Sequence, residues 1–275
     1  MGKDEPQGEL WERPLDEVPL AFLDLEMTGL ELARDRVVEV CIERVVGGVC
    51  VDRVESLVWP GDDRAGGASE VHGLSAEVLA GAPPFETIAG DVRRILEGAV
   101  PVAHAAPWDA RFLRQELERA GHPMELEHWV DTLALSRRSF LLPNHSLVAL
   151  RTHFGLPCDA AHRASGDVRA LRDIFARCCE VLKPTSAKDL WETRIHSERA
   201  RAAIVAQLQA AAESGAPLKV ASRGAGRPIR EMVVRVTALE LEADPPRALG
   251  YTLPGRARVT LRLDRVVRAE PASEP

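Results

Sequence analysis

The sequence is poor in cysteine and aromatic residues, and it contains no long hydrophobic run. Its five cysteines form no CxxC pair and are odd in number, which favours reduced thiols over a disulfide framework. No apolar run approaches the length of a membrane span. The acidic, polar stretch 1–17 lacks the apolar core of a signal peptide. We therefore expect a cytoplasmic protein without membrane contact, and a flexible tail over residues 1–17.

The charge is unevenly distributed along the chain. The formal net charge is −7, from 35 Lys and Arg and 42 Asp and Glu among 275 residues. Residues 215–275 hold 11 of the basic residues and only 7 of the acidic ones, so the remainder is strongly acidic. An acidic surface repels a polyanion unless metal ions or local arginine clusters intervene. Charge alone therefore does not identify the partner.

The first part of the chain has an α/β pattern. Residues 20–26 form an apolar run typical of a buried strand. Two alternating segments, 36–46 and 49–59, flank Gly47-Gly48, which predicts a β-hairpin. A short strand is expected at 99–105. Helical periodicity and helix-end signals predict helices at 84–98, 107–121, 132–141, 146–154 and 163–182.

The pattern changes after residue 183. Residues 186–214 predict one long helix, and short β-like runs follow from residue 217 onward. We therefore predict an α/β domain at 18–183, a helical linker at 184–214 and a β-rich module at 215–275.

Three short stretches carry acids that a simple core does not need. Asp24 and Glu26 lie two apart in the first strand, so both side chains project from one face, and two like charges there require compensation. Asp109 lies in the opening turn of a helix that follows a strand. His162 and Asp167 flank another helix start. Taken singly, the two helix-start acids are also explained by the helix dipole, and His162 by a loop or packing role.

Taken in order, these stretches resemble the DEDDh family of 3′→5′ exonucleases. "DLEMTGL" (24–30), "HAAPWD" (104–109) and "HRASGD" (162–167) match its three motifs. The sequence between the motifs is similar to the polymerase III epsilon-type branch, whereas "DLEMTGL" is closest to the oligoribonuclease type. The resemblance covers about residues 18–182. It implies a ribonuclease H-like fold, with a mixed five-stranded sheet flanked by helices.

The resemblance also implies the chemistry. Four carboxylates would bind two Mg²⁺ or Mn²⁺ ions, since hard cations prefer oxygen ligands. His162, with an ordinary pKa near 6.5, would deprotonate the attacking water. The metal-binding acids are expected to be Asp24, Glu26, Asp109 and Asp167. The residues expected to contact the terminal nucleotide are Met27, Thr28, Gly29, Leu30, His104 and Trp108, although Met27 and Leu30 are equally explained by core packing.

Two departures from the family pattern lie in the second motif. Ala105 replaces the usual Asn, and Trp108 replaces the more common Phe. Loss of the Asn side chain removes a hydrogen bond, which is expected to reduce activity without abolishing it.

The C-terminal part resembles, more weakly, the small barrel called the WYL domain, with "GYTL" (250–253) near its signature and "RLDRV" (262–266) like its closing strand. Such a module would bind nucleic acid or a nucleotide through basic side chains. The alternative is a β appendage whose arginines are merely solvated. The candidate arginines are Arg223, Arg227, Arg230 and Arg262.

We therefore predict a metal-dependent 3′→5′ exonuclease that acts on single-stranded ends and releases 5′-mononucleotides, with DNA favoured over RNA. One alternative is a non-catalytic nucleic-acid-binding or regulatory protein that uses the basic module. Another is an oligoribonuclease acting on short RNA. A third is a proofreading subunit that docks a DNA polymerase or another repair protein through residues 184–275.

Overall fold

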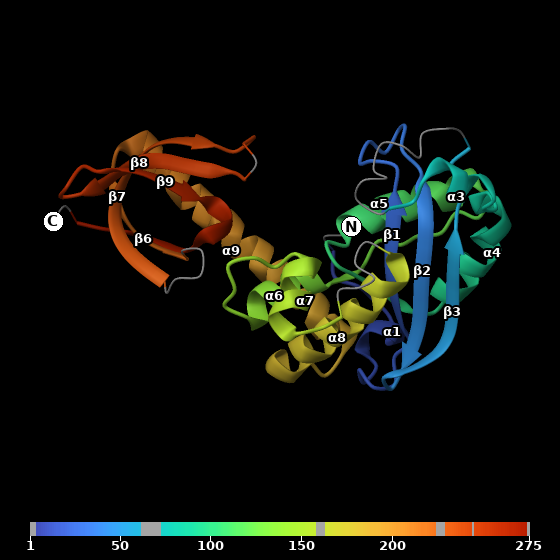
Figure 1. Cartoon of the computed structure of the whole chain (residues 1–275). Coiled ribbons are helices and arrows are strands. Elements are labelled where there is room, and N and C mark those ends of the chain that lie inside the picture. Colours follow the sequence, from blue (N-terminus) through green and yellow to red (C-terminus); the bar gives the residue numbers. More distant parts are fainter. Residues whose placement is uncertain (1–3, 62–72, 158–162, 224–228, 244, 274–275) are drawn as a thin grey trace. The chain divides into compact units, whose positions relative to one another are not determined.

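The computed structural model describes residues 4–61, 73–157, 163–223, 229–243 and 245–273 (Figure 1). The chain divides into two compact units. The first comprises Met1–Phe140 and His145–Arg194, and the second comprises Leu141–Asn144 and Ile195–Pro275. None of the helices in the described ranges combines the length and hydropathy of a bilayer-spanning segment.

The first unit is built on a mixed five-stranded sheet, as expected for the ribonuclease H-like fold. The strand order is β3-β2-β1-β4-β5. β1 pairs antiparallel with β2, β2 antiparallel with β3, and β4 lies parallel to both β1 and β5. The hairpin predicted at Gly47-Gly48 is confirmed. The strands are β1 Leu20–Met27, β2 Val37–Val46, β3 Val49–Leu57, β4 Val100–Ala103 and β5 Val130–Asp131.

Helices cover both faces of this sheet. Odd-numbered residues of β1, such as Leu23 and Leu25, pack in a core with Phe85, Ile95 and Leu113 from two of the helices. The even-numbered residues face the long helix α8, which packs on β1 and β2 (Figure 1). The helices of this unit are α1 Glu9–Glu12, α3 Ala76–Ala80, α4 Phe85–Leu96, α5 Pro107–Arg119, α6 Thr132–Ser139, α7 Leu147–Phe154 and α8 Ala164–Leu182.

Two residues of the stretch 4–17, which was expected to form a flexible tail, make specific contacts. Trp11 in α1 is buried, with its ring 5.9 Å from that of His128 in an edge-to-face contact. The Leu15 N–H donates to the Thr185 carbonyl at 3.0 Å. These contacts attach the stretch to the first unit. The acidic composition of residues 1–17 gave no indication of them.

The second unit is an antiparallel sheet with strand order β10-β6-β7-β8-β9. The helix α9 Ala187–Ser214 extends through the predicted linker, and its Leu208 and Ala211 pack into the core of this sheet. The segment "RLDRV" is not a single closing strand, because Leu263–Arg265 form a 3₁₀ turn between two strands. The strands are β6 Pro217–Arg223, β7 Ile229–Glu240, β8 Arg247–Leu253, β9 Arg258–Arg262 and β10 Val266–Pro271.

Candidate active site

Three of the predicted metal ligands converge at the end of β1. Carboxylate oxygens of Asp24, Glu26 and Asp167 lie within 4.8 Å of one another. The first two share a face of β1 because strand side chains alternate. The third comes from the first turn of α8, which covers that same face. The alternation predicted from sequence therefore brings the carboxylates together, and each contributes a hard oxygen donor suited to Mg²⁺ or Mn²⁺.

The fourth predicted ligand, Asp109, approaches from α5. It is buried at 6% exposure. The Leu25 backbone N–H and its own N–H donate to its carboxylate, which lowers its pKa. Burial has the larger effect and raises the pKa of Asp109 to about 8. The charge of Asp109 raises the pKa of Asp24, and the charge of Glu26 raises that of Asp109, so Asp109 lies near these two acids.

The cluster repels itself in the absence of cations. Burial raises the pKa of Asp24 well above its usual range, and the charges of Asp109 and Asp167 raise it further. Burial also raises the pKa of Glu26 to about 7, with Asp167 as the next cause. Like charges at this distance disfavour joint ionisation unless cations lie between them. The chemistry of the donor set therefore fits a pair of divalent ions.

Arg151 in α7 is a partner of Asp167 that the sequence analysis missed. Its side chain is 2% exposed and its Nη1 donates to Asp167 Oδ1. Its Nε donates to the Pro157 carbonyl at 2.9 Å, which fixes the guanidinium from a second direction. A signal was present, since Arg151 falls on the apolar stripe of α7, four residues after Leu147.

Glu39 in β2 is a fifth carboxylate beside the cluster, and the sequence analysis missed it as well. It lies opposite Glu26 in the sheet register and is 1% exposed. Arg163 donates to it from Nε at 3.1 Å and from Nη2 at 2.9 Å, and the Ala164 N–H donates at 3.0 Å. Glu39 therefore holds the first turn of α8, the element that carries Asp167.

The turn after β1 is stabilised by hydrogen bonds among its own residues. The Thr28 hydroxyl donates to Asp35 Oδ1 at 3.2 Å and accepts from the Arg36 N–H at 3.1 Å. The Thr28 N–H donates to the Arg36 carbonyl at 2.9 Å. A Cβ at Gly29 would collide with the Asp35 carboxylate, so a larger residue there would force the Asp35 side chain to move. Leu30 is 60% exposed.

Of the residues in this turn that were predicted to contact the nucleotide, Leu30 is the one with a largely exposed side chain. Met27 packs against the main core, which favours its alternative explanation as a core residue.

His104 is a structural residue in this geometry. Its Nε2 lies 2.9 Å from the His145 carbonyl, which can only accept, so Nε2 carries the proton. Its Nδ1 lies 2.9 Å from the Thr132 hydroxyl, which donates to it. Burial lowers the pKa of His104 to about 4. The ring is therefore neutral, and its two nitrogens link the end of β4 to Thr132 at the start of α6 and to the His145 carbonyl.

The departure at Ala105 has a backbone consequence. Its φ is 59°, in the left-handed region that Asn tolerates better than Ala. Its N–H donates to Asp131 Oδ1 at 3.0 Å, which holds the turn that leads into α5. Trp108, the other departure, is 41% exposed and stacks with Arg111. His162 lies outside the described residues, whereas residues 163–167 of its motif are described.

Comparisons with known proteins show the family to which this chain belongs. The chain belongs to the exonuclease family, because the family model described as Exonuclease matches residues 21–175. It is 31% identical over 163 residues to a DNA polymerase III subunit epsilon of Treponema pallidum, covering 58% of this chain and 76% of that protein.

It is also 33% identical over 205 residues to a DNA polymerase III subunit epsilon-like protein of Rhodobacter capsulatus. That match covers 71% of this chain but only 29% of the relative. The chain likewise spans only 12% of a PolC-type DNA polymerase III of Thermotoga maritima, to which it is 31% identical.

Solved structures show the same fold at lower identity. Exonuclease X in complex with 5′ overhanging duplex DNA superposes with a TM-score of 0.52 at 22% identity, covering 64% of this chain and 99% of that one. Exonuclease I superposes with a TM-score of 0.54 at 18% identity, covering 86% of this chain and 55% of that one. These likenesses support the α/β exonuclease fold.

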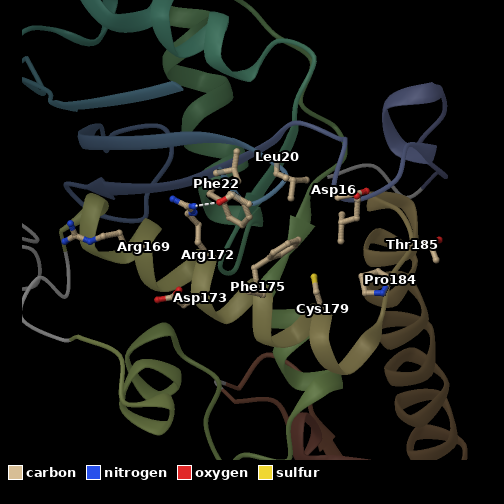
Figure 2. Close-up of a pocket in the computed structure, with 15 residues that line it drawn as sticks. Asp16, Leu20, Phe22, Arg169, Arg172, Asp173, Phe175, Cys179, Pro184 and Thr185 are labelled. Atoms are coloured by element: carbon tan, nitrogen blue, oxygen red, sulfur yellow. Dashed lines mark hydrogen bonds between the residues drawn. The ribbon is translucent and has the colours of Figure 1, made fainter. Parts of the chain in front are cut away.

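A hollow lies at the end of β1 away from the carboxylate cluster, on the face that α8 covers (Figure 2). Its volume is about 800 Å³. Phe22 and Phe175 form its floor, with ring centroids 5.1 Å apart in an edge-to-face contact. Arg172 lies at its edge, where it donates to Glu43 Oε2 at 2.6 Å. Its walls are mostly apolar, so it does not repeat the chemistry of the carboxylate cluster.

Proposed function

We propose that the protein is a metal-dependent 3′→5′ exonuclease of the DEDDh type. It would hydrolyse phosphodiester bonds at the 3′ end of single-stranded nucleic acid, with DNA favoured over RNA, and release 5′-mononucleotides. The observation that carries the proposal is the convergence of Asp24, Glu26 and Asp167 at the end of β1. Asp109 lies close enough for its charge to raise the pKa of Asp24, and the pKa values of Asp24, Glu26 and Asp109 are all raised. Such a cluster is costly without cations and useful with them.

In this mechanism the residues of the chain bind the metal ions and orient the reacting groups. The four carboxylates would bind two Mg²⁺ or Mn²⁺ ions, which supply Lewis-acid stabilisation of the charge developing around the phosphate. Arg151 positions Asp167, and Glu39 positions the first turn of α8. His162 would accept the proton of the attacking water as the bond from phosphorus to the leaving 3′-oxygen breaks. Leu30 would pack on the terminal nucleotide.

The test compares an Asp24→Asn variant with the unchanged protein. The substrates are 5′-labelled single-stranded DNA, duplex DNA, RNA and dinucleotides, each with Mg²⁺, Mn²⁺ or EDTA. We expect a ladder that shortens from the 3′ end of single-stranded DNA, no cleavage in EDTA, and no cleavage by the variant. Faster cleavage of RNA dinucleotides would indicate an oligoribonuclease instead.

Asp91→Asn is the matched control, because Asp91 is an exposed carboxylate of α4 paired with Arg94. It should cleave like the parent protein. Full activity in Asp24→Asn would overturn the proposal, and binding without metal-dependent cleavage would favour the non-catalytic alternative.

A further inference from the structure

One face of the C-terminal sheet is covered by the core of this unit. Val234, Val236, Ala248 and Leu261 are buried against α9. Because strand side chains alternate, the residues next to them in β7, β8 and β9 project from the opposite face. This outer face of β7–β9 is defined by Arg235, Arg247, Leu249, Tyr251, Arg258 and Arg262.

The register places an aromatic ring between two arginines. Arg235 of β7 lies directly opposite Tyr251 of β8, and Tyr251 lies directly opposite Arg258 of β9. Neighbouring strands are about 4.8 Å apart, so the three side chains form a continuous row across the sheet. Tyr251 is the only tyrosine of the chain and is half-buried, whereas Arg258 is exposed.

A second pair of arginines continues this row toward the other end of β8. Arg247 and Arg262 lie directly opposite each other, an arrangement that is destabilising for like charges. Each is balanced locally by an acid, Arg247 by Glu240 and Arg262 by Asp264, the latter pair at 2.7 Å. Four arginines against two acids leave the outer face positive, although the whole chain is acidic.

We propose that the outer face of β7–β9 binds single-stranded nucleic acid, with Tyr251 stacking on a base and the arginines contacting phosphates. A positive face that carries an aromatic ring is the chemistry that binds single strands without sequence preference, and arginine–phosphate contacts supply salt-dependent affinity. The inference rests on the proposed nuclease function for its choice of ligand. It assigns to this unit a role in holding the strand, independent of cleavage.

The test measures binding by the full chain carrying Asp24→Asn, in EDTA, so that the strand stays intact. The probe is a fluorescein-labelled oligodeoxythymidine of about 16 nucleotides, followed by anisotropy, with an oligouridine and a duplex in parallel. We expect Tyr251→Ala to raise Kd about tenfold, in line with a stacking contribution of ~1–3 kcal/mol, and Tyr251→Phe to bind like the parent. Arg258→Glu should weaken binding and make the slope of log K against log salt shallower by about 0.7 or more.

Arg93→Glu is the control for charge reversal, since Arg93 is an exposed residue of α4. It should leave binding unchanged. Circular dichroism checks that each variant remains folded. Parent-like affinity in both Tyr251→Ala and Arg258→Glu, or exclusive binding of the duplex, would overturn the proposal.

Dinucleotide cleavage separates this inference from the proposed function. With the native Asp24 restored, Tyr251→Ala should slow the cleavage of long strands more than the cleavage of dinucleotides. If the parent cleaves nothing, the proposed function fails, while the binding measurement in EDTA still decides the role of the outer face.

Discussion

At the scale of single residues, the carboxylate cluster holds protons that cations would displace. Burial raises the pKa of Glu26 to about 7 and that of Asp109 to about 8. Both values lie above those of an unfolded chain, so the folded protein binds protons that unfolding releases. Without divalent ions, its stability is therefore greatest in acid.

We predict that in EDTA the free energy of unfolding falls as pH rises from about 4.5 to about 8. The shift at Glu26 alone corresponds to roughly 3 kcal/mol. Urea unfolding at a series of pH values measures this. Glu26→Gln should flatten the profile, because the amide does not titrate, and Asp91→Asn should not. Mg²⁺ or Mn²⁺ should restore stability most strongly near pH 8. A parent profile that is flat in EDTA would contradict the prediction.

Ala105 shows how one departure from a family motif acts through the backbone. Its left-handed conformation, with φ of 59°, is costly for Ala and easily adopted by Gly or Asn. The resemblance alone pointed to a lost side-chain hydrogen bond. The structure adds a conformational reason for Asn at this position.

We predict that Ala105→Gly and Ala105→Asn each raise the free energy of unfolding by about 0.5–1 kcal/mol, since both relieve the left-handed strain. Ala176→Gly is the matched control. Ala176 lies exposed in the middle of α8, where the same replacement should lower stability by about 1 kcal/mol. Thermal and urea unfolding measure both changes, and equal signs for the two Ala→Gly variants would refute this account of Ala105.

At the scale of elements, α8 is fixed to β2 by two ion pairs along one face. Arg163 and the Ala164 N–H bind Glu39 at the end of α8 near the cluster. Arg172 binds Glu43, four residues further along β2. Both glutamates are buried, so their environments are comparable, but only Glu39 lies beside the carboxylate cluster.

We predict that Glu39→Gln and Glu43→Gln destabilise the protein to a similar degree, about 1–3 kcal/mol each, because each leaves a charge-assisted contact incomplete. Only Glu39→Gln should lower kcat, by about tenfold or more, since it loosens the turn that carries Asp167. Steady-state kinetics on single-stranded DNA, performed well below the unfolding temperature, separates the two effects. An equal loss of activity in both variants would show that the fall reflects stability alone.

At the scale of the whole molecule, each unit has its own hydrophobic core. Leu23 lies in the core of the first unit and Val234 in that of the second, and both are fully buried. Residues of the two cores come from separate segments, so a cavity in one core removes packing energy from that unit.

We predict that Leu23→Ala lowers the stability of the first unit by about 2–5 kcal/mol, and that Val234→Ala destabilises the second unit, leaving dinucleotide cleavage intact. Native-state hydrogen exchange, followed by peptide, locates each loss. Matching increases in exchange across both sheets for either variant would show instead that the chain unfolds as one cooperative unit.

The sequence by itself determined the local features of this protein. The alternation in β1 placed Asp24 and Glu26 on one face, Gly47-Gly48 fixed the hairpin, and three ordered motifs identified the exonuclease family. These signals are local or periodic, so they can be recognised without knowledge of contacts between distant residues. The change of pattern after residue 183 likewise anticipated a second sheet.

Only the tertiary structure decided which distant residues meet. It placed Glu39 opposite Glu26, buried Arg151 against Asp167, and set Tyr251 between Arg235 and Arg258. Strand register depends on how whole strands pair, and a one-residue shift moves every side chain to the other face. It also anchored the N-terminal segment through Trp11, which composition had suggested was loose. These outcomes depend on long-range packing, which a single sequence read residue by residue does not specify.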